Sequence, residues 1–223
     1  MQAVIFDVDG VLVDSYHAHL ESWQATAREH EVPFTREDFA RTFGRTSRDI
    51  IRLLWPNGEA LSDEAIRAVD DRKEALYREI VAAAFPAMDG AAELIRGLHQ
   101  AGFRIAAGSS GPPENVQLAV ERLGMAHAFN ALVTGMDVTR GKPDPQVFLL
   151  AAERLGVPPA RCVVVEDAPA GVEAAHRAGM TCVGVISTGR THSDVAHAER
   201  VVRSLRELSP RDFAALLNGA NVR

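Results

Sequence analysis

The N-terminal stretch Ala3-Val4-Ile5-Phe6-Asp7-Val8-Asp9-Gly10 places a short apolar run directly before two carboxylates. Such a run is typical of a buried β-strand, and the two aspartates stand two residues apart. In extended backbone, side chains at positions i and i+2 point to the same side. Because ligands of open parallel sheets bind beyond the carboxyl ends of the strands, we expect Asp7 and Asp9 to face such a site.

Downstream, apolar β-branched runs alternate with amphipathic helical stretches, and a glycine follows each of these stretches, as is common beyond a helix C-terminus. This alternation predicts an α/β fold with a doubly wound, mostly parallel sheet of the Rossmann-like type. The expected strands are residues 3–6, 104–107, 131–134, 162–165, 181–185 and 200–202. The expected helices between them are residues 91–100, 114–123, 145–155 and 170–178.

One region breaks the alternation, because only helical periodicity occurs between residues 15 and 88. The expected helices there are residues 17–30, 36–43, 47–54 and 62–84. We interpret this region as an inserted α-helical cap domain, residues 15–88, in an α/β catalytic core formed by residues 1–14 and 89–223. The last residues, 219–223, are expected to form a frayed tail.

Composition narrows the class of protein. The chain has 223 residues and a net charge of −6, whereas a general nucleic-acid binder usually carries a basic excess. Cys162 and Cys182 each lie in an apolar run, which indicates burial rather than a disulfide framework or a zinc site. The start of the chain does not resemble a secretory signal, and no apolar run approaches the length of a membrane span. We therefore expect a cytoplasmic protein with no nucleic-acid or membrane partner.

Two further segments carry groups that could hold a phosphate. Ser109 and Ser110 lie between an expected strand and an expected helix, where hydroxyl and backbone N–H groups can meet an anion. Lys142 lies in the loop just before the helix that starts near Pro145. An ammonium group there could neutralise a phosphate and the charge that builds in a transition state.

A second carboxylate pair, Glu166 and Asp167, follows the apolar run at residues 162–165. Mg²⁺ prefers oxygen ligands and keeps several waters, so one or two carboxylates besides Asp7 and Asp9 would complete a site. Each segment alone also fits an acidic turn, a helix cap, a solvated loop lysine or a charge at a helix N-terminus. Together they supply a nucleophile, a proton donor, phosphate contacts and a metal site, as phosphoryl transfer requires.

The ordered set Asp7-Val8-Asp9-Gly10, Ser109, Gly141-Lys142-Pro143 and Glu166-Asp167 resembles the haloacid dehalogenase superfamily over essentially the whole chain. The helical insert resembles the cap of the subgroup that contains β-phosphoglucomutase and phosphoglycolate phosphatase. This resemblance implies a Mg²⁺-dependent phosphatase that hydrolyses a small phosphate monoester, such as a sugar phosphate, through an aspartyl-phosphate intermediate.

The resemblance also implies roles for the motif residues. Asp7 would be the nucleophile, and Asp9 would protonate the leaving group and then activate water. The implied phosphate-binding residues are Ser109, Ser110 and Lys142. The implied metal ligands are Asp7, the backbone carbonyl of Asp9, Asp167 and, directly or through water, Glu166.

Candidate substrate contacts in the cap come from the same resemblance. His19 and Trp23 match the pattern of the first cap helix, and Lys73 lies in a stretch similar to the cap lysine region of β-phosphoglucomutase. Arg45 or Arg48 could grip a distal anionic group. Closure of the cap would exclude bulk water and select the substrate.

Other functions remain open at this point. A β-phosphoglucomutase-type sugar phosphomutase is favoured by His19 and Lys73, but residues 110–113 lack the Lys-Asn pair which that enzyme usually offers to a second phosphate. A dehalogenase would not need Asp9, and Lys73 is a poor positional match for the Schiff-base lysine of phosphonoacetaldehyde hydrolase. A silent binding protein on the same scaffold is disfavoured because every catalytic position is filled. We expect a phosphorylated small-molecule substrate and a monomer or weak dimer.

Overall fold

The computed structural model describes residues 1–219. The chain forms two compact units, which we call the core unit, Met1–Asp14 with Pro86–Arg223, and the helical unit, Ser15–Phe85. All but the first residue of the expected tail at 219–223 lies outside the described residues. Gly219 itself is the last residue of a helix.

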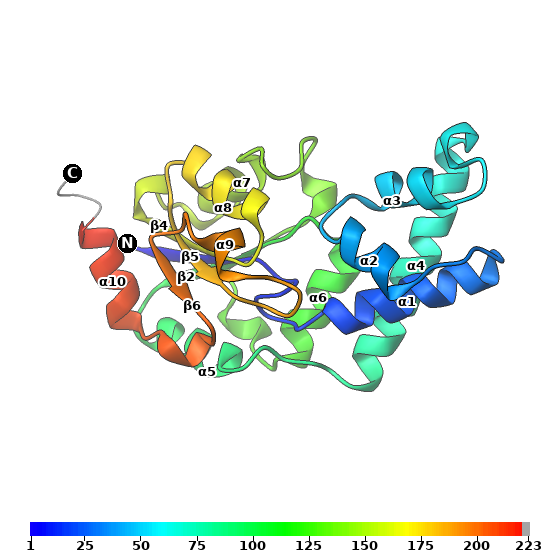
Figure 1. Cartoon of the computed structure of the whole chain (residues 1–223). Helices are drawn as coiled ribbons and strands as arrows, with labels where there is room; N and C mark the ends of the chain where they lie inside the picture. Colours follow the sequence, from blue (N-terminus) through cyan, green and yellow to red (C-terminus); the bar gives the residue numbers. More distant parts are fainter. Residues whose placement is uncertain (220–223) are drawn as a thin grey trace. The chain divides into compact units, whose positions relative to one another are not determined.

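A six-stranded sheet forms the centre of the core unit (Figure 1). The strands lie in the order β3-β2-β1-β4-β5-β6, and every neighbouring pair is parallel. This order, with β1 in the middle and the chain winding outward to both sides, confirms the predicted α/β class. The strands are β1 Ala3–Phe6, β2 Arg104–Gly108, β3 Ala131–Val133, β4 Cys162–Glu166, β5 Thr181–Val185 and β6 Arg200–Val202.

Helices flank the sheet of the core unit, with α7 and α8 on one side and α5 and α10 on the other (Figure 1). Burial on both faces explains why β1 and β4 consist almost entirely of apolar residues. The core cluster on the α7 side includes Ile5, Val164 and Phe148, none of which is exposed to solvent. The helices of this unit are α5 Ala91–Gln100, α6 Pro113–Arg122, α7 Gln146–Leu155, α8 Pro169–Arg177, α9 His192–Val195 and α10 Pro210–Gly219.

The register of the strands brings the ends of β1, β2 and β4 to one edge of the sheet. Phe6, the last residue of β1, lies opposite Ala107 of β2 and Val165 of β4. The residues that follow these three positions therefore leave the sheet at the same edge. This register is what allows side chains from distant parts of the sequence to meet.

The short helix α9 and the C-terminal helix α10 are absent from the sequence-based expectation. In α10, Phe213 and Leu217 are buried at i,i+4 spacing, and Asp212 accepts hydrogen bonds from the backbone N–H and the hydroxyl of Ser209 at 2.8 and 2.6 Å. Two large apolar residues one helical turn apart are a weak periodic signal. Packing against the rest of the core unit, rather than the helix propensity of the segment, stabilises such a helix.

The helical unit consists of α1 Tyr16–Glu29, α2 Arg36–Thr42, α3 Ser47–Leu54 and α4 Asp63–Ala83. Each bound lies within one residue of the expected one. The unit has its own apolar core, in which the ring of Trp23 stacks on Phe34 and meets Trp55 edge-on. It therefore buries its hydrophobic surface largely within itself, as a separate domain does.

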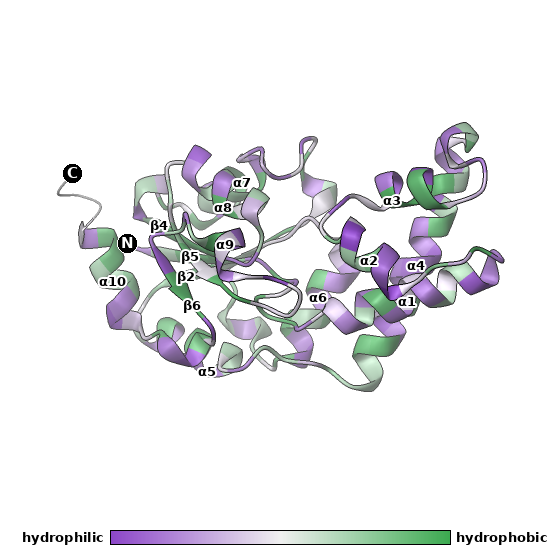
Figure 2. Ribbon diagram, in the orientation of Figure 1, coloured by the Kyte–Doolittle hydropathy of each residue, from purple (hydrophilic) through white to green (hydrophobic). Residues whose placement is uncertain are grey.

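The hydropathy pattern agrees with these layers (Figure 2). The helices carry alternating hydrophilic and hydrophobic bands, as expected when one face packs and the other meets water. Within residues 1–219, none of the helices combines the length and the apolarity that crossing a bilayer would require.

Leu155 and Leu149 provide a matched test of the core, because both lie on α7. Leu155 belongs to the core cluster at 2% exposure, whereas Leu149 is 40% exposed. Leu155→Ala is expected to lower the free energy of unfolding by about 2–5 kcal/mol, because it removes buried contacts and leaves a cavity. Leu149→Ala should lower it by less than about 1 kcal/mol. Urea unfolding followed by circular dichroism measures both, and equal losses would contradict this packing.

Candidate active site

The strand β1 delivers Asp7 to the edge of the sheet. The N–H of Asp7 still donates to the carbonyl of Val165 in β4, at 2.9 Å, so the backbone at Asp7 is held by the sheet. The chain then turns sharply at Gly10, which has a φ of 75° and whose N–H donates to the carbonyl of Val13. Positive φ suits glycine because it has no Cβ. The carboxylate of Asp7 is thus fixed at a buried position at the end of a rigid element.

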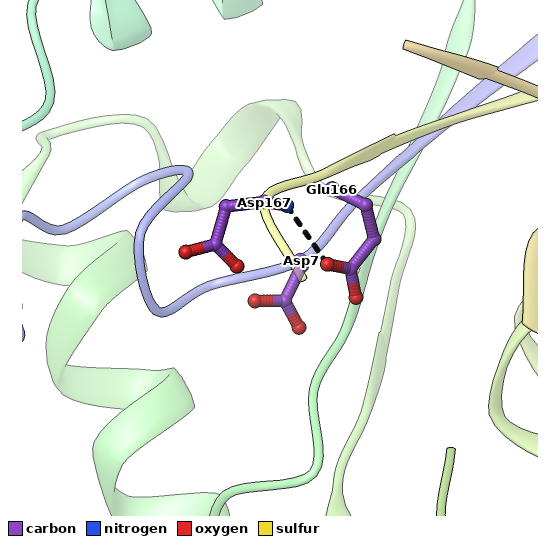
Figure 3. Close-up of side chains that lie close together, drawn as sticks. All are labelled: Asp7, Glu166 and Asp167. Carbon is purple, nitrogen blue, oxygen red and sulfur yellow. Dashed lines mark hydrogen bonds between the residues drawn. The ribbon is translucent and has the colours of Figure 1, made fainter. Parts of the chain in front are cut away.

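Asp7, Glu166 and Asp167 form a buried acidic cluster (Figure 3). One carboxylate oxygen from each of the three lies within 4.8 Å of those of the other two. Glu166 ends β4, and its Oε2 accepts hydrogen bonds from the backbone N–H groups of Asp167 and Ala168 at 2.8 and 2.9 Å. The two neighbouring strands therefore bring the first and the last acidic motifs together.

The ammonium group of Lys142 lies against this cluster. Its Nζ donates to Oδ1 of Asp7 at 2.6 Å, to Oε1 of Glu166 at 2.6 Å and to the carbonyl of Gly108 at 3.2 Å. It also lies over the ring of Phe148, 4.8 Å from its centroid. The lysine thus joins the ends of β1, β2 and β4 through one charged group.

A side chain on α7 holds the loop that carries Lys142. Oε1 of Gln146, the first residue of α7, accepts from the backbone N–H groups of Thr139 and Arg140, both at 3.0 Å. The N–H of Gln146 donates to Oδ1 of Asp144 at 3.0 Å. These bonds hold the backbone on both sides of Lys142. Gln146 was not among the residues expected from the sequence.

The loop after β2 brings Ser109 to the same edge. Ser109 is buried, its N–H donates to the carbonyl of Val133, and its Oγ accepts from the N–H of Gly111 at 3.0 Å. A Cβ added to Gly111 would lie 3.3 Å from Oγ of Ser109 and 3.8 Å from Oδ2 of Asp9, so this loop passes beside Asp9. Ser110 is exposed, and α6 begins at Pro113 without a side-chain cap.

The charged groups around Asp7 shift its pKa in opposite directions. Burial raises the pKa of Asp7 well above its ordinary value, Lys142 opposes this rise, and the carboxylates of Glu166, Asp167 and Asp9 add to it. Burial lowers the pKa of Lys142, but the carboxylates of Asp7 and Glu166 raise it by more. The net effect is a raised pKa, which keeps the lysine protonated. Lys142 thus compensates part of the buried negative charge.

Asp167 has a further partner that the sequence analysis missed. The hydroxyl of Ser187 donates to Oδ2 of Asp167 at 2.6 Å, and Nε of Arg190 lies 3.7 Å from the same oxygen. Burial and the carboxylate of Glu166 raise the pKa of Asp167 to about 7, although Ser187 and Arg190 lower it. The signal for Ser187 was its position two residues beyond β5, the strand that pairs with β4.

The donor set of the site fits a divalent cation. With all groups ionised, four carboxylates face two cations, which leaves 4 − 2 = 2 negative charges. Uncompensated buried charge costs several kcal/mol per ion, so the site would take up protons or a cation. Carboxylate oxygens are the ligands that Mg²⁺ prefers. The carboxylates are Asp7, Asp9, Glu166 and Asp167, and the cations are Lys142 and Arg190.

The three residues of the acidic cluster would not contribute equally to binding a metal ion. Both oxygens of Glu166 already accept bonds, from Lys142 and from two backbone N–H groups, which favours an indirect role for it. Asp7 and Asp167 are therefore the carboxylates best placed to bind Mg²⁺. The carboxylate of Asp9 is not part of the cluster of Asp7, Glu166 and Asp167, which is compatible with a contribution from its backbone carbonyl alone.

In the helical unit, His19, Trp23 and Lys73 lie together. The Nζ of Lys73, which is buried, is 2.8 Å from Nδ1 of His19, 2.6 Å from Oε1 of Glu74 and 5.5 Å from the centroid of the Trp23 ring. The ring of His19 stacks on that of Tyr77 at 4.2 Å. A protonated lysine would donate to Nδ1 of His19, which leaves the proton of a neutral imidazole on Nε2.

The two candidate arginines of the helical unit are placed differently. Arg45 is exposed. Nη1 of Arg48 lies 2.6 Å from Oδ1 of Asp63, and both side chains of this pair are exposed. Neither arginine is therefore part of the buried Lys73 cluster.

Comparison with known proteins gives the chain its family. Validoxylamine A 7′-phosphate phosphatase from Streptomyces hygroscopicus subsp. limoneus is 35% identical over 214 residues, covering 93% of this chain and 95% of that protein. β-Phosphoglucomutase from Bacillus subtilis is 33% identical over 190 residues, covering 83% of each chain. The crystal structure of β-phosphoglucomutase from Clostridium difficile shares the fold, with a TM-score of 0.86 over 100% of both chains at 23% identity. A family model described as haloacid dehalogenase-like hydrolase matches residues 1–179, and the chain belongs to that family.

Proposed function

We propose that this chain is a Mg²⁺-dependent phosphatase that hydrolyses a small phosphate monoester, such as a sugar phosphate, through an aspartyl-phosphate. The observation that carries the proposal is the buried Asp7 carboxylate, which Lys142 contacts at 2.6 Å within the acidic cluster. The family and the similarity to a phosphatase support the reaction class. The similarity to a sugar phosphomutase supports the substrate class.

Asp7 and Asp9 divide the chemistry. A carboxylate oxygen of Asp7 attacks phosphorus, and the bond from phosphorus to the ester oxygen breaks as the new bond forms. The departing oxygen takes a proton from Asp9. Asp9 then removes a proton from a water molecule that attacks the phosphorus, which releases inorganic phosphate and restores Asp7.

The remaining residues hold the phosphoryl group and balance its charge. Lys142 offers a positive charge beside Asp7. Ser110, which follows Ser109 in the same loop, is a further candidate for binding the phosphate. Because Oγ of Ser109 accepts from Gly111, its own hydroxyl proton can donate to a phosphate oxygen. Mg²⁺ held by Asp7, Asp167 and the Asp9 carbonyl would supply the positive charge that lets an anionic phosphate approach an anionic nucleophile.

The helical unit is proposed as the cap that selects the substrate. His19 and Lys73 present a ring N–H and an ammonium group, and Trp23 lies beside them. Such donors suit the hydroxyl groups of a sugar, whereas the ring of Trp23 packs in the apolar core of the helical unit. The arginines Arg45 and Arg48 remain candidates for a distal anionic group, and Arg48 would first have to leave Asp63.

Asp7→Asn tests the nucleophile. The substitution keeps the size of the side chain but removes the attacking carboxylate, so phosphate release should fall by at least about 10³-fold. The measurement is phosphate release from a panel of sugar phosphates and an aryl phosphate, with and without Mg²⁺. Asp71→Asn, at an exposed position on α4, is the matched control and should keep wild-type rates. Wild-type turnover in Asp7→Asn would rule out this mechanism.

A sugar phosphomutase is the second candidate, since the Bacillus subtilis mutase is a relative. The segment after Ser109 reads Ser110-Gly111-Pro112-Pro113 and offers no side-chain cation to a second phosphate. We therefore expect hydrolysis to exceed isomerisation. Incubation with β-glucose 1-phosphate and Mg²⁺, with inorganic phosphate and glucose 6-phosphate measured in the same sample, separates the two. Rapid formation of glucose 6-phosphate with negligible phosphate release would select the mutase.

A further inference from the structure

The two oxygens of the Asp167 carboxylate have different surroundings. Oδ2 accepts a hydrogen bond of 2.6 Å from the hydroxyl of Ser187, and Nε of Arg190 lies 3.7 Å from it. Both residues belong to the segment that follows β5, which lies next to β4 in the sheet. Oδ2 is therefore held from the side of β5.

Gly10 closes the space around the same oxygen. A Cβ added to Gly10 would lie 2.0 Å from Oδ2 of Asp167 and 3.0 Å from Oγ of Ser187. The backbone of the turn after β1 thus packs directly on both groups. With Ser187, Arg190 and the Gly10 backbone all beside Oδ2, Oδ1 is the oxygen better placed to face a cation.

Rotation of this carboxylate matters for a magnesium site. The terminal torsion of an aspartate is broad, so the side chain alone does not fix the plane of its carboxylate. Mg²⁺ demands nearly ideal octahedral geometry at short distances. A hydrogen bond that fixes this plane before the ion arrives would therefore strengthen binding, as outer contacts of metal ligands do.

We propose that Ser187 is a positioning residue of the magnesium site, whose hydroxyl holds Oδ2 of Asp167 so that Oδ1 faces the ion. The proposal rests on the proposed function, because it requires Asp167 to be a magnesium ligand. Ser187 touches neither the substrate nor the reacting atoms in this scheme. Its effect reaches the chemistry only through Asp167.

The neighbouring residue Thr188 links the same segment to Asp14, the last residue before the helical insert. Its Oγ1 donates to Oδ2 of Asp14 at 2.9 Å, and the N–H of Asp14 donates to the carbonyl of Pro86 at 2.8 Å. Residues 187 and 188 therefore anchor the segment at two points within the core unit. This anchoring keeps the Ser187 hydroxyl in place.

The test is the affinity of the substrate-free protein for Mg²⁺, measured by isothermal titration calorimetry. Ser187→Ala is expected to raise the dissociation constant about 10-fold or more, because loss of such an outer contact typically costs 10–100-fold in affinity. In turnover assays, the Mg²⁺ concentration for half-activation should rise in parallel, whereas the rate at saturating Mg²⁺ should be largely kept. A purely structural defect would instead lower the metal-free melting temperature and leave the affinity of the folded protein unchanged.

Two other variants complete the set. Ser193→Ala removes an exposed hydroxyl on α9, where Ser193 contacts Thr191, and should leave the Mg²⁺ affinity unchanged. If Ser187→Ala does not fold, Ser187→Cys replaces it, since a thiol of similar size is only a weak hydrogen-bond donor. Ser187→Cys is likewise expected to raise the dissociation constant for Mg²⁺.

Asp167→Asn separates failure of this inference from failure of the proposed function. If Asp167→Asn loses Mg²⁺ binding while Ser187→Ala, or Ser187→Cys in its place, binds like the wild type, the role of Ser187 is overturned and the magnesium site stands. Equal weakening in the Ser187 and Ser193 variants would also overturn it. If Asp167→Asn keeps both Mg²⁺ binding and hydrolysis, the proposed magnesium site itself is wrong.

Discussion

The ammonium group of Lys142 is the contact on which the site depends. It reaches the carboxylates of Asp7 and Glu166 at 2.6 Å each and a carbonyl at the end of β2, so it ties three strand ends together. Without it, two buried carboxylates would face each other with no hydrogen-bonded cation between them. Breaking a buried ion pair by removing one partner typically costs about 3–5 kcal/mol. The same lysine therefore stabilises the core unit and, in the proposed mechanism, supports the reactivity of Asp7.

One lysine does not neutralise the negative charge of the site, and the remaining charge favours uptake of a cation. The carboxylates outnumber the cations near them, and burial raises the pKa values of Asp7 and Asp167. A bound divalent cation would favour the ionised form of both aspartates. Because an ion that binds only the folded state stabilises it by mass action, Mg²⁺ would add to stability as well as to catalysis. Substrate selection is the role proposed for the helical unit, which has its own buried cluster of Lys73, His19 and Glu74.

The sequence predicted the strands well because their apolar runs are short, continuous and bounded by polar residues. Where two neighbouring strands end, as at Asp7 and Glu166, the geometry of a parallel sheet brings the side chains together without further information. Lys142 is harder to place, since its loop has no periodicity and is held by contacts such as those of Gln146, which the sequence does not show. Ser187 was missed because a single serine after a strand is as typical of a loop as of a site. Ser187 reaches Asp167 only because β5 packs beside β4, and no local sequence pattern predicts that pairing.

The claim that residues distant in the chain converge on one divalent ion can be tested by diffraction. Crystals grown with Mn²⁺, which also prefers oxygen ligands, would show the ion directly in an anomalous difference map. The account predicts one strong peak in the core unit, within coordination distance of the carboxylates of Asp7 and Asp167, with Lys142 still contacting Asp7. A map with no peak there, at Mn²⁺ concentrations that support phosphate release, would contradict it.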